Sequence, residues 1–115
     1  IILLDRFTDS TIAYQHYGMG VNLKIINFIN TYLLKNIKAD FTFLHLVNKK
    51  NLHLRLKQRK KLNRYDKFDF KFYKKVQDGF IKIAKKDKDK YSLIDSNLDF
   101  KFNKGTIIKK IKKII

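Results

Sequence analysis

The fold is decided by residues 1–15, which read Ile1-Ile2-Leu3-Leu4-Asp5-Arg6-Phe7-Thr8-Asp9-Ser10-Thr11-Ile12-Ala13-Tyr14-Gln15. The apolar run over residues 1–4 is too short for a helix and predicts a buried parallel strand. An Asp-Arg pair follows, and then residues that start a helix. Because open parallel sheets bind ligands beyond the carboxyl ends of their strands, Asp5 and Arg6 are expected to meet a phosphate or a metal-bound phosphate.

The same stretch also has a purely structural interpretation. Asp9, Ser10 and Thr11 are residue types that cap helices, and Arg6 fits a solvated loop charge. The spacing by itself favours neither interpretation.

Length and composition predict a single domain without disulfides or a membrane span. The 115 residues supply one core, and the absence of cysteine excludes disulfides and thiolate metal sites. No apolar run approaches the roughly 20 residues that span a bilayer, and no cleavable leader is present. We therefore expect a cytoplasmic protein with no membrane partner. Because the chain opens in the middle of a strand and without methionine, it is expected to be the back half of a longer protein.

The formal net charge of +17 would, taken alone, indicate a nucleic-acid or anionic-membrane partner. Heavy use of Lys, Ile, Asn and Phe, with no Pro, Trp or Cys, gives a simpler source, since this bias is typical of a very AT-rich coding sequence. A basic module that binds nucleic acid through its lysines and the aromatic residues Phe68, Phe70, Phe72 and Tyr73 remains the alternative function.

Hydrophobic periodicity predicts further elements along the chain. In order, these are a turn at 16–20, a helix over 21–36, a strand over 41–47, a basic helix from 49 to 61, a helix over 67–86, a strand over 91–94 and a closing helix against the sheet over 106–115. The helices over 21–36, 67–86 and 106–115 each have an apolar stripe that is expected to face the core. Strands that alternate with helices predict an α/β parallel sheet.

Two motifs resemble the thymidylate (dTMP) kinase family. The first is Asp5-Arg6-Phe7-x-x-Ser10-x-x-Ala13-Tyr14-Gln15, and the second is Leu-Arg-x-x-x-Arg-x-x-Leu-x-Arg from Leu54 to Arg64, which is similar to the lid of bacterial members. Met19, Lys60 and Asn63 depart from the family pattern at positions that usually hold Arg, Gly and Asp.

The resemblance implies a P-loop kinase-like parallel sheet with flanking helices, incomplete because the N-terminal strands are missing. Residues 1–115 would be the C-terminal part of one nucleoside monophosphate kinase domain, with the lid at about 55–66. In that fold a further strand lies between the strand ending at Leu4 and the strand over 41–47. The resemblance therefore predicts that these two strands lie about 10 Å apart, twice the ordinary spacing, with no ladder between them.

The resemblance also implies a set of site residues. For dTMP they are Arg6, Ser10, Thr11, Tyr14 and Gln15, with Tyr14 beside the sugar where a 2′-hydroxyl would project. For ATP they are Arg55, Arg59, Arg64, Asp95, Ser96 and Asn97. Arg6, Arg55, Arg59 and Arg64 would be catalytic through the phosphates, and Asp5 would act on Mg²⁺.

The function so implied is phosphoryl transfer from ATP to dTMP, with ATP as co-substrate and Mg²⁺ as cofactor. A homodimer is expected at full length, and a nucleic-acid partner is not. The 115 residues contain no Gly-rich loop ending in Gly-Lys-Ser/Thr, so this chain alone is expected to be inactive.

Overall fold

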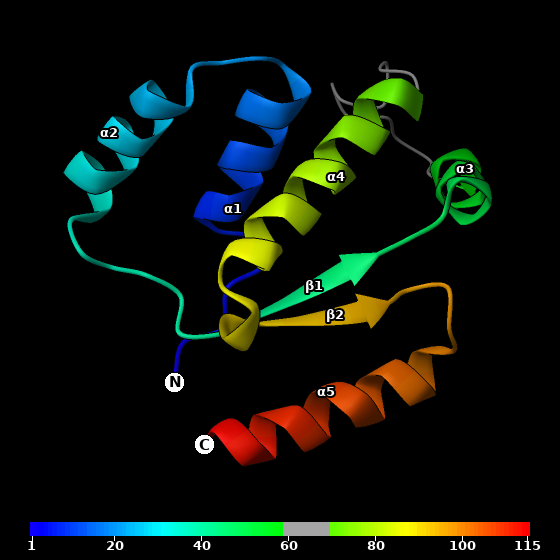
Figure 1. Cartoon of the computed structure of the whole chain (residues 1–115). Helices are drawn as coiled ribbons and strands as arrows, with labels where there is room; N and C mark the ends of the chain where they lie inside the picture. The colour runs from blue at the N-terminus through cyan, green and yellow to red at the C-terminus, as the bar shows by residue number, and fades with distance from the viewer. Residues whose placement is uncertain (59–69) are drawn as a thin grey trace.

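The computed structural model describes residues 1–58 and 70–115 (Figure 1). Its sheet consists of two parallel strands, β1 (Thr42–Leu46) and β2 (Tyr91–Asp95), which pair from Thr42 opposite Tyr91 to Leu46 opposite Asp95. Leu44 and Ile94 are the buried residues of these strands. Both strands form where the apolar runs predicted them.

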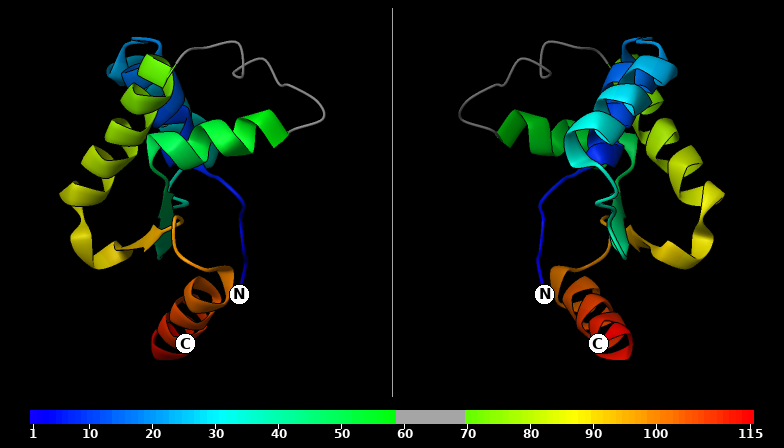
Figure 2. Two further views of the ribbon diagram at one scale, coloured as in Figure 1. Left: turned by 90° about the vertical axis from the view of Figure 1, so that its right-hand side faces the viewer. Right: turned by 90° about the vertical axis from the view of Figure 1, so that its left-hand side faces the viewer.

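Helices lie on both sides of the strands in the view of Figure 1, with α1 and α4 above them and α5 below. The two side views of Figure 2 also show α5, in orange and red, below the strands. The helical elements in chain order are α1 (Thr8–Thr11), the π-helix η1 (Ile12–Gly18), α2 (Leu23–Leu34), α3 (Lys49–Gln58), α4 (Phe70–Lys86), the short 3₁₀ helix η3 (Lys88–Lys90) and α5 (Phe100–Ile114). A parallel sheet with flanking helices is therefore confirmed.

The core lies where η1 crosses α4. Ala13, Phe72 and Val76 are buried there, and Tyr14, Tyr73, Phe80 and Ile83 pack around them. Glycine makes the close approach possible, because a Cβ on Gly79 would lie 2.6 Å from both Cβ and Cγ of Tyr17. The stripe predicted on α4 faces this core, which confirms its structural role.

The predicted strand at the N-terminus is wrong. Residues 1–4 form no strand, and their side chains are exposed, from 62% at Leu4 to 96% at Ile1. A strand needs a partner for its backbone groups, and among the described residues β1 pairs with β2 and not with residues 1–4. The described residues show no ladder between residues 1–4 and β1, and the separation of about 10 Å between them remains a prediction.

The segment after Asp5 is helical for longer than expected. We predicted a turn over 16–20, but the π-helix continues to Gly18, and Met19 N–H donates to the Tyr14 carbonyl. Gly20, at φ +79°, then turns the chain toward α2. The π-helix closes its backbone bonds internally, so the chain does not turn until it ends.

Two apolar stripes are less buried than predicted. In α2, Ile26 is buried, but Phe28 and Tyr32 are 72% and 75% exposed. In α5, Ile107 and Ile111 are half-buried, whereas Ile108, Ile114 and Ile115 are exposed. Periodicity shows which face of a helix is apolar, but burial also needs a neighbouring element to cover that face.

The last helix begins earlier than the predicted 106, at Phe100, because Asp99 caps it. The Asp99 carboxylate accepts from the backbone N–H groups of Lys101 and Phe102.

Within the described residues, no helix combines the length and the apolar character that crossing a membrane would require.

Candidate active site

Arg6 and Tyr14, two residues predicted to bind dTMP, lie together. The guanidinium carbon of Arg6 lies 5.4 Å from the centre of the Tyr14 ring, a cation–π distance. Arg6 also has φ +71°, in the left-handed region that non-glycine residues rarely adopt and that costs on the order of 1 kcal/mol. Backbone strain of this kind is common at functional sites.

The Tyr14 ring packs against two aromatic rings of α4. Its ring lies 6.1 Å from that of Phe72 and 6.3 Å from that of Phe80, measured between centroids. Tyr14 itself is half-buried, in the π-helix η1. π-Helical turns are rare and occur often at functional sites, and no sequence signal predicted this one.

The other predicted dTMP residues follow on the same helical segment. Ser10 and Thr11 belong to α1, and Gln15 to η1. Thr11 is exposed, and Ser10 and Gln15 are half-buried. Ser10 and Thr11 do not cap α1, because Phe7 is its N-cap residue and no side chain bonds there. The capping interpretation of this stretch is therefore wrong.

Asp9 does not cap α1 either, because its carboxylate accepts a hydrogen bond from the hydroxyl of Tyr91, at 2.6 Å. Burial, together with this hydrogen bond, raises the pKa of Tyr91 above its ordinary value. The hydroxyl is therefore protonated at neutral pH and acts as the donor.

At the other end of the sheet, the predicted ATP residues that the structure describes, Arg55 and residues 95–97, also come together. Arg55 on α3 donates from Nη2 to the carbonyl oxygen of Ser96, at 2.6 Å. Ser96 follows β2, and its N–H donates to the carbonyl of Leu46 at the end of β1. The ends of both strands thus hold the loop over residues 95–97 in place.

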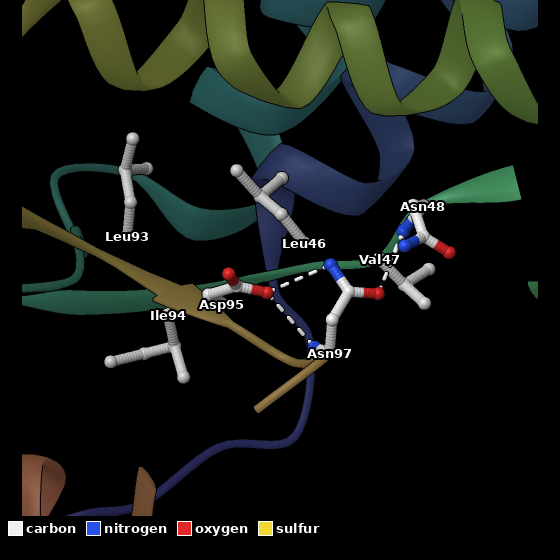
Figure 3. Close-up of a pocket in the computed structure, with 7 residues that line it drawn as sticks. All are labelled: Leu46, Val47, Asn48, Leu93, Ile94, Asp95 and Asn97. Carbon is white, nitrogen blue, oxygen red and sulfur yellow. Dashed lines mark hydrogen bonds between the residues drawn. The ribbon is translucent and has the colours of Figure 1, made fainter. Parts of the chain in front are cut away.

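Side-chain hydrogen bonds stiffen this loop further. Asp95 Oδ1 accepts from the backbone N–H and the side-chain amide of Asn97, at 2.9 and 2.8 Å (Figure 3). From α5, Asn103 Nδ2 donates to the carbonyl of Asp95, and His45 Nδ1 lies 3.2 Å from the hydroxyl oxygen of Ser96.

An open pocket of about 380 Å³ adjoins this loop (Figure 3). Its wall has an apolar part and a polar part, made respectively of Leu46, Val47, Leu93 and Ile94, and of Asn48, Asp95 and Asn97. A mixed lining of this kind suits a ligand with an apolar body and a few hydrogen-bonding groups.

A larger hollow of about 2410 Å³ adjoins predicted dTMP residues but is not lined by Arg55 or by residues 95–97. Asp5, Arg6 and Tyr14 line it, and so does Asn48, which also lines the smaller pocket. Ligand pockets are typically about 300–1,000 Å³, so this hollow is too large to be a closed substrate site.

Arg59 and Arg64 lie outside the described residues, as does the rest of the lid beyond Gln58. Within residues 1–58 and 70–115, His, Cys, Asp and Glu side chains form no cluster of three or more that could hold a metal ion. Asp5 is exposed. A single exposed carboxylate fits a Mg²⁺ ion that is held largely by substrate phosphates, which is how nucleotide sites usually bind it.

The aromatic residues of the alternative function are poorly placed for stacking on bases. Phe72 is buried in the core, and Tyr73 is half-buried against it. Phe70 has the ammonium group of Lys49 at 4.6 Å from its ring centre. Phe68 lies outside the described residues. A base-stacking platform needs exposed ring faces, so the described part of α4 does not favour nucleic-acid binding.

Two residues of the polar loop cluster were missed by the sequence analysis. Asn48 and Asn51 both bind Asn97, and Asn48 Oδ1 also accepts from Asn51 N–H. Asn48 precedes the basic helix, and asparagine is a favoured N-cap residue, so this signal was present in the sequence. The contact of either residue with position 97 had no signal, since 49 positions separate Asn48 from Asn97.

Comparison with known proteins places these residues in a family. The family model described as thymidylate kinase matches residues 1–107. The match includes the Asp5-Arg6 motif, α3 and the loop over residues 95–97.

Individual relatives agree with the family model. The thymidylate kinase of Sulfurihydrogenibium sp. is 37% identical over 99 residues, covering 86% of this chain and 48% of that protein. The thymidylate kinase of Wolbachia pipientis wMel is 42% identical over 95 residues, covering 82% of this chain and 46% of that protein. The chain thus spans about half the length of these curated relatives.

A solved structure gives the same result for the fold. The crystal structure of thymidylate kinase from Ehrlichia chaffeensis superimposes with a TM-score of 0.63 and 30% sequence identity, over 94% of this chain and 48% of that one. The sequence match extends well beyond the two motifs, and the shared architecture agrees with it. The chain belongs to the thymidylate kinase family.

Proposed function

We propose that this chain supplies the nucleotide-contacting, C-terminal part of a kinase that transfers the γ-phosphoryl group of ATP to dTMP, giving ADP and dTDP. The observation that carries the proposal is the hydrogen bond from Arg55 to the carbonyl of Ser96. It joins the helix that leads into the lid to the loop expected to flank adenine. Two segments 41 positions apart thus come together, which supports an ATP site formed by both.

Arg6, which lines the larger hollow, is suited to the phosphate of dTMP. Its guanidinium is exposed and rests on the Tyr14 ring. A planar guanidinium binds two phosphate oxygens at once, and this bond is stronger than a cation–π contact at an exposed site. Phosphate binding therefore stabilises Arg6 more than its present contact does.

Phosphoryl transfer needs alignment and charge neutralisation more than covalent chemistry from the protein. A well-placed arginine contributes on the order of 10³- to 10⁵-fold in rate in related phosphoryl transfers. Arg6 on one side and Arg55 on the other suit this role, and Arg59 and Arg64 are assigned to it by their motif alone. Thr11 and Gln15 are assigned to the thymine, and Ser10 to the dTMP site.

Bound Mg²⁺ would neutralise phosphate charge, and Asp5 is the residue of this chain assigned to it. An exposed carboxylate after residues 1–4 can bind a water of the ion's shell without moving the fold. The remaining partners belong to the same proposal. These partners are the N-terminal half with the phosphate loop and a second copy in a homodimer. The proposed location is the cytoplasm.

The proposal is tested by substituting Arg55 in the full-length enzyme, made by joining this chain to the N-terminal half of a thymidylate kinase. Arg55→Ala should raise KM for ATP roughly 10- to 100-fold, the scale of a lost hydrogen bond to a charged group. KM for dTMP should change little, because Arg55 lies on the ATP side. Lys57→Ala is the matched control. Lys57 is exposed on the same helix, and its replacement also removes one positive charge.

A steady-state assay with each substrate varied in turn distinguishes the outcomes. Equal changes of KM for ATP in Arg55→Ala and Lys57→Ala would show a general charge effect and contradict the assignment of Arg55. A fused protein that folds but does not phosphorylate dTMP would contradict the proposed function itself.

A further inference from the structure

We propose that Asn97 is a positioning residue, which holds α3 against the loop over residues 95–97 and so keeps Arg55 beside the ATP site. Asn97 then does not use its side-chain oxygen to bind the nucleotide. The inference concerns the same site and rests on the proposed function for its consequence in catalysis. Its structural part concerns three residues, Asn48, Asn51 and Asn97, which we call the asparagine cluster.

The Asn97 side chain uses most of its hydrogen-bonding capacity within the protein. Its Oδ1 accepts from the backbone N–H of Asn48, at 3.0 Å, and from Nδ2 of Asn51, at 2.9 Å. An amide oxygen has two lone pairs, so both are used within the protein. One of its two amide hydrogens is directed at Asp95 Oδ1, 2.8 Å from Nδ2. The side-chain oxygen therefore has both of its acceptor positions filled within the protein, without any ligand.

The partners of Asn97 lie at the start of α3 and at the end of β2. Asn48 and Asn51 form the start of α3, since Asn48 Oδ1 caps the helix by accepting from Asn51 N–H. The Asn97 oxygen satisfies the Asn48 N–H group at this helix start. Asp95, at the end of β2, holds the other side of Asn97. Asn97 thus joins the beginning of one helix to the end of one strand.

A second contact between α3 and the same loop is made by Arg55. Arg55 donates to Ser96, and Arg55 is seven positions beyond Asn48, about 10 Å along a helix at 1.5 Å per residue. Two attachments at different heights fix both the position and the tilt of a helix, whereas one attachment leaves it free to pivot. Without Asn97, the Arg55 contact alone would hold α3 to this loop among the bonds described here.

The consequence is that the asparagine cluster orders Arg55. A long side chain loses rotamer freedom when it is fixed, so an arginine held in place by a rigid helix binds phosphate at lower entropic cost. The cluster contains no charge and does not compete with ATP for Arg55. Its role is to place the guanidinium, not to bind the nucleotide.

The test measures amide hydrogen exchange by NMR on the 115-residue chain without nucleotide. In Asn97→Ala, the Asn48 amide should exchange roughly fivefold faster, as expected for loss of a hydrogen bond worth about 1 kcal/mol. Asn103→Ala is the matched control, because it removes a donor to the same loop from α5 and leaves α3 untouched. The Asn48 amide should not change in that variant.

The conservative variant Asn97→Asp separates positioning from general loss of stability. It keeps an oxygen acceptor for Asn48 and Asn51, and its negative charge is favourable at a helix N-terminus. It loses the donor to Asp95 and places two carboxylates together. The Asn48 amide should therefore keep its wild-type rate, while the Leu98 amide, which donates to the Asp95 carbonyl, should exchange faster.

Three results would overturn the proposal. They are an unchanged Asn48 amide in Asn97→Ala, an equal acceleration in Asn103→Ala, and failure of Asn97→Asp to restore the wild-type rate. If Asn97→Ala does not fold, Asn51→Ala removes one of the same bonds from the partner side. The Leu98 amide should then exchange faster than in wild type, and an unchanged rate would again contradict the coupling.

An ATP titration followed by NMR connects the cluster to the proposed function. Asn97→Ala should weaken ATP binding in the wild-type background and have no effect in an Arg55→Ala background, because it acts through Arg55. Additive effects would show that Asn97 contacts ATP itself and would overturn the positioning role. The titration uses the full-length enzyme, made by joining this chain to the N-terminal half of a thymidylate kinase. If the wild type in this form shows no shifts with ATP, the proposed ATP site is contradicted, and the exchange rates still decide whether Asn97 holds α3.

Discussion

The hydroxyl of Tyr91 donates a hydrogen bond to Oδ2 of Asp9, with 2.6 Å between the two oxygens and 82 positions between the residues. Tyr91 begins β2 and Asp9 lies in α1, so this bond ties the sheet to the helix that carries the predicted dTMP residues. Tyr91→Phe should lower the free energy of unfolding by about 1–2 kcal/mol, since a hydrogen bond to a carboxylate is lost in a partly buried place. Tyr32→Phe is the matched control, because Tyr32 is 75% exposed.

The same bond predicts a dependence of stability on pH. The pKa of Tyr91 is raised in the folded chain by burial and by Asp9, so folding favours the protonated hydroxyl. Its contribution is therefore complete below pH ~10, the ordinary tyrosine pKa, and is lost as the pH rises toward the raised pKa. The difference in unfolding free energy between wild type and Tyr91→Phe, measured by urea denaturation, should shrink above pH ~10. A constant difference up to pH ~12 would contradict the assignment.

Two glycines in helices predict effects of opposite sign. In α4, a Cβ at position 79 would meet Cβ and Cγ of Tyr17 at 2.6 Å, atoms near the backbone that cannot swing away. Gly79→Ala should therefore destabilise the chain by about 1–3 kcal/mol, despite the better helix propensity of alanine. In α5, a Cβ at position 105 meets nothing within 4 Å. Gly105→Ala should stabilise by up to about 1 kcal/mol.

Thermal or urea unfolding of both glycine variants checks this pair. A stabilising Gly79→Ala would show that η1 does not approach α4 as closely as the structure has it. A destabilising Gly105→Ala would show that α5 is covered at this position by a neighbour.

Tyr14 predicts the selectivity for the sugar. In the full-length enzyme, Tyr14→Ala should relax discrimination against the ribose form of the monophosphate more than it lowers turnover of dTMP, because it removes the side chain assigned beside C2′. The ratio of kcat/KM for the two monophosphates measures this. Tyr32→Ala removes a ring of the same kind from the exposed face of α2 and should leave the ratio unchanged. An unchanged ratio in Tyr14→Ala would remove Tyr14 from the site.

The isolated 115-residue chain is predicted to show no phosphoryl transfer. A phosphate loop supplies backbone N–H groups around the β-phosphate, a lysine for the transferred group and a hydroxyl for Mg²⁺. Gly18 and Gly20 are not followed by Lys-Ser or Lys-Thr, so these residues do not provide one. A coupled assay with ATP, Mg²⁺ and dTMP should detect activity only after the chain is joined to, or mixed with, an N-terminal half of a thymidylate kinase. Turnover by the chain alone would contradict this prediction.

Local pattern was sufficient where an element is stabilised by its own surroundings. The strands at 42–46 and 91–95 and the stripe on α4 agree with prediction, because aromatic and β-branched runs and three- and four-residue spacing reflect faces that are in fact covered. Residues 1–4 have an equally apolar pattern and form no strand. Their pattern predicted a preference for burial, and no neighbouring strand is present among the described residues to satisfy it.

The sequence by itself determined the family, which the Asp5-Arg6 and Ala13-Tyr14-Gln15 motif indicates, and it predicted which residues contact each nucleotide. Side-chain type and short spacing are local properties, so a linear motif records them. Only the tertiary structure decided that Arg6 rests on Tyr14, that Arg55 binds the Ser96 carbonyl and that Asn97 joins α3 to β2. The last two contacts join residues 41 or more positions apart, and whether they form depends on how the two strands bring α3 and the loop after β2 to the same edge of the sheet.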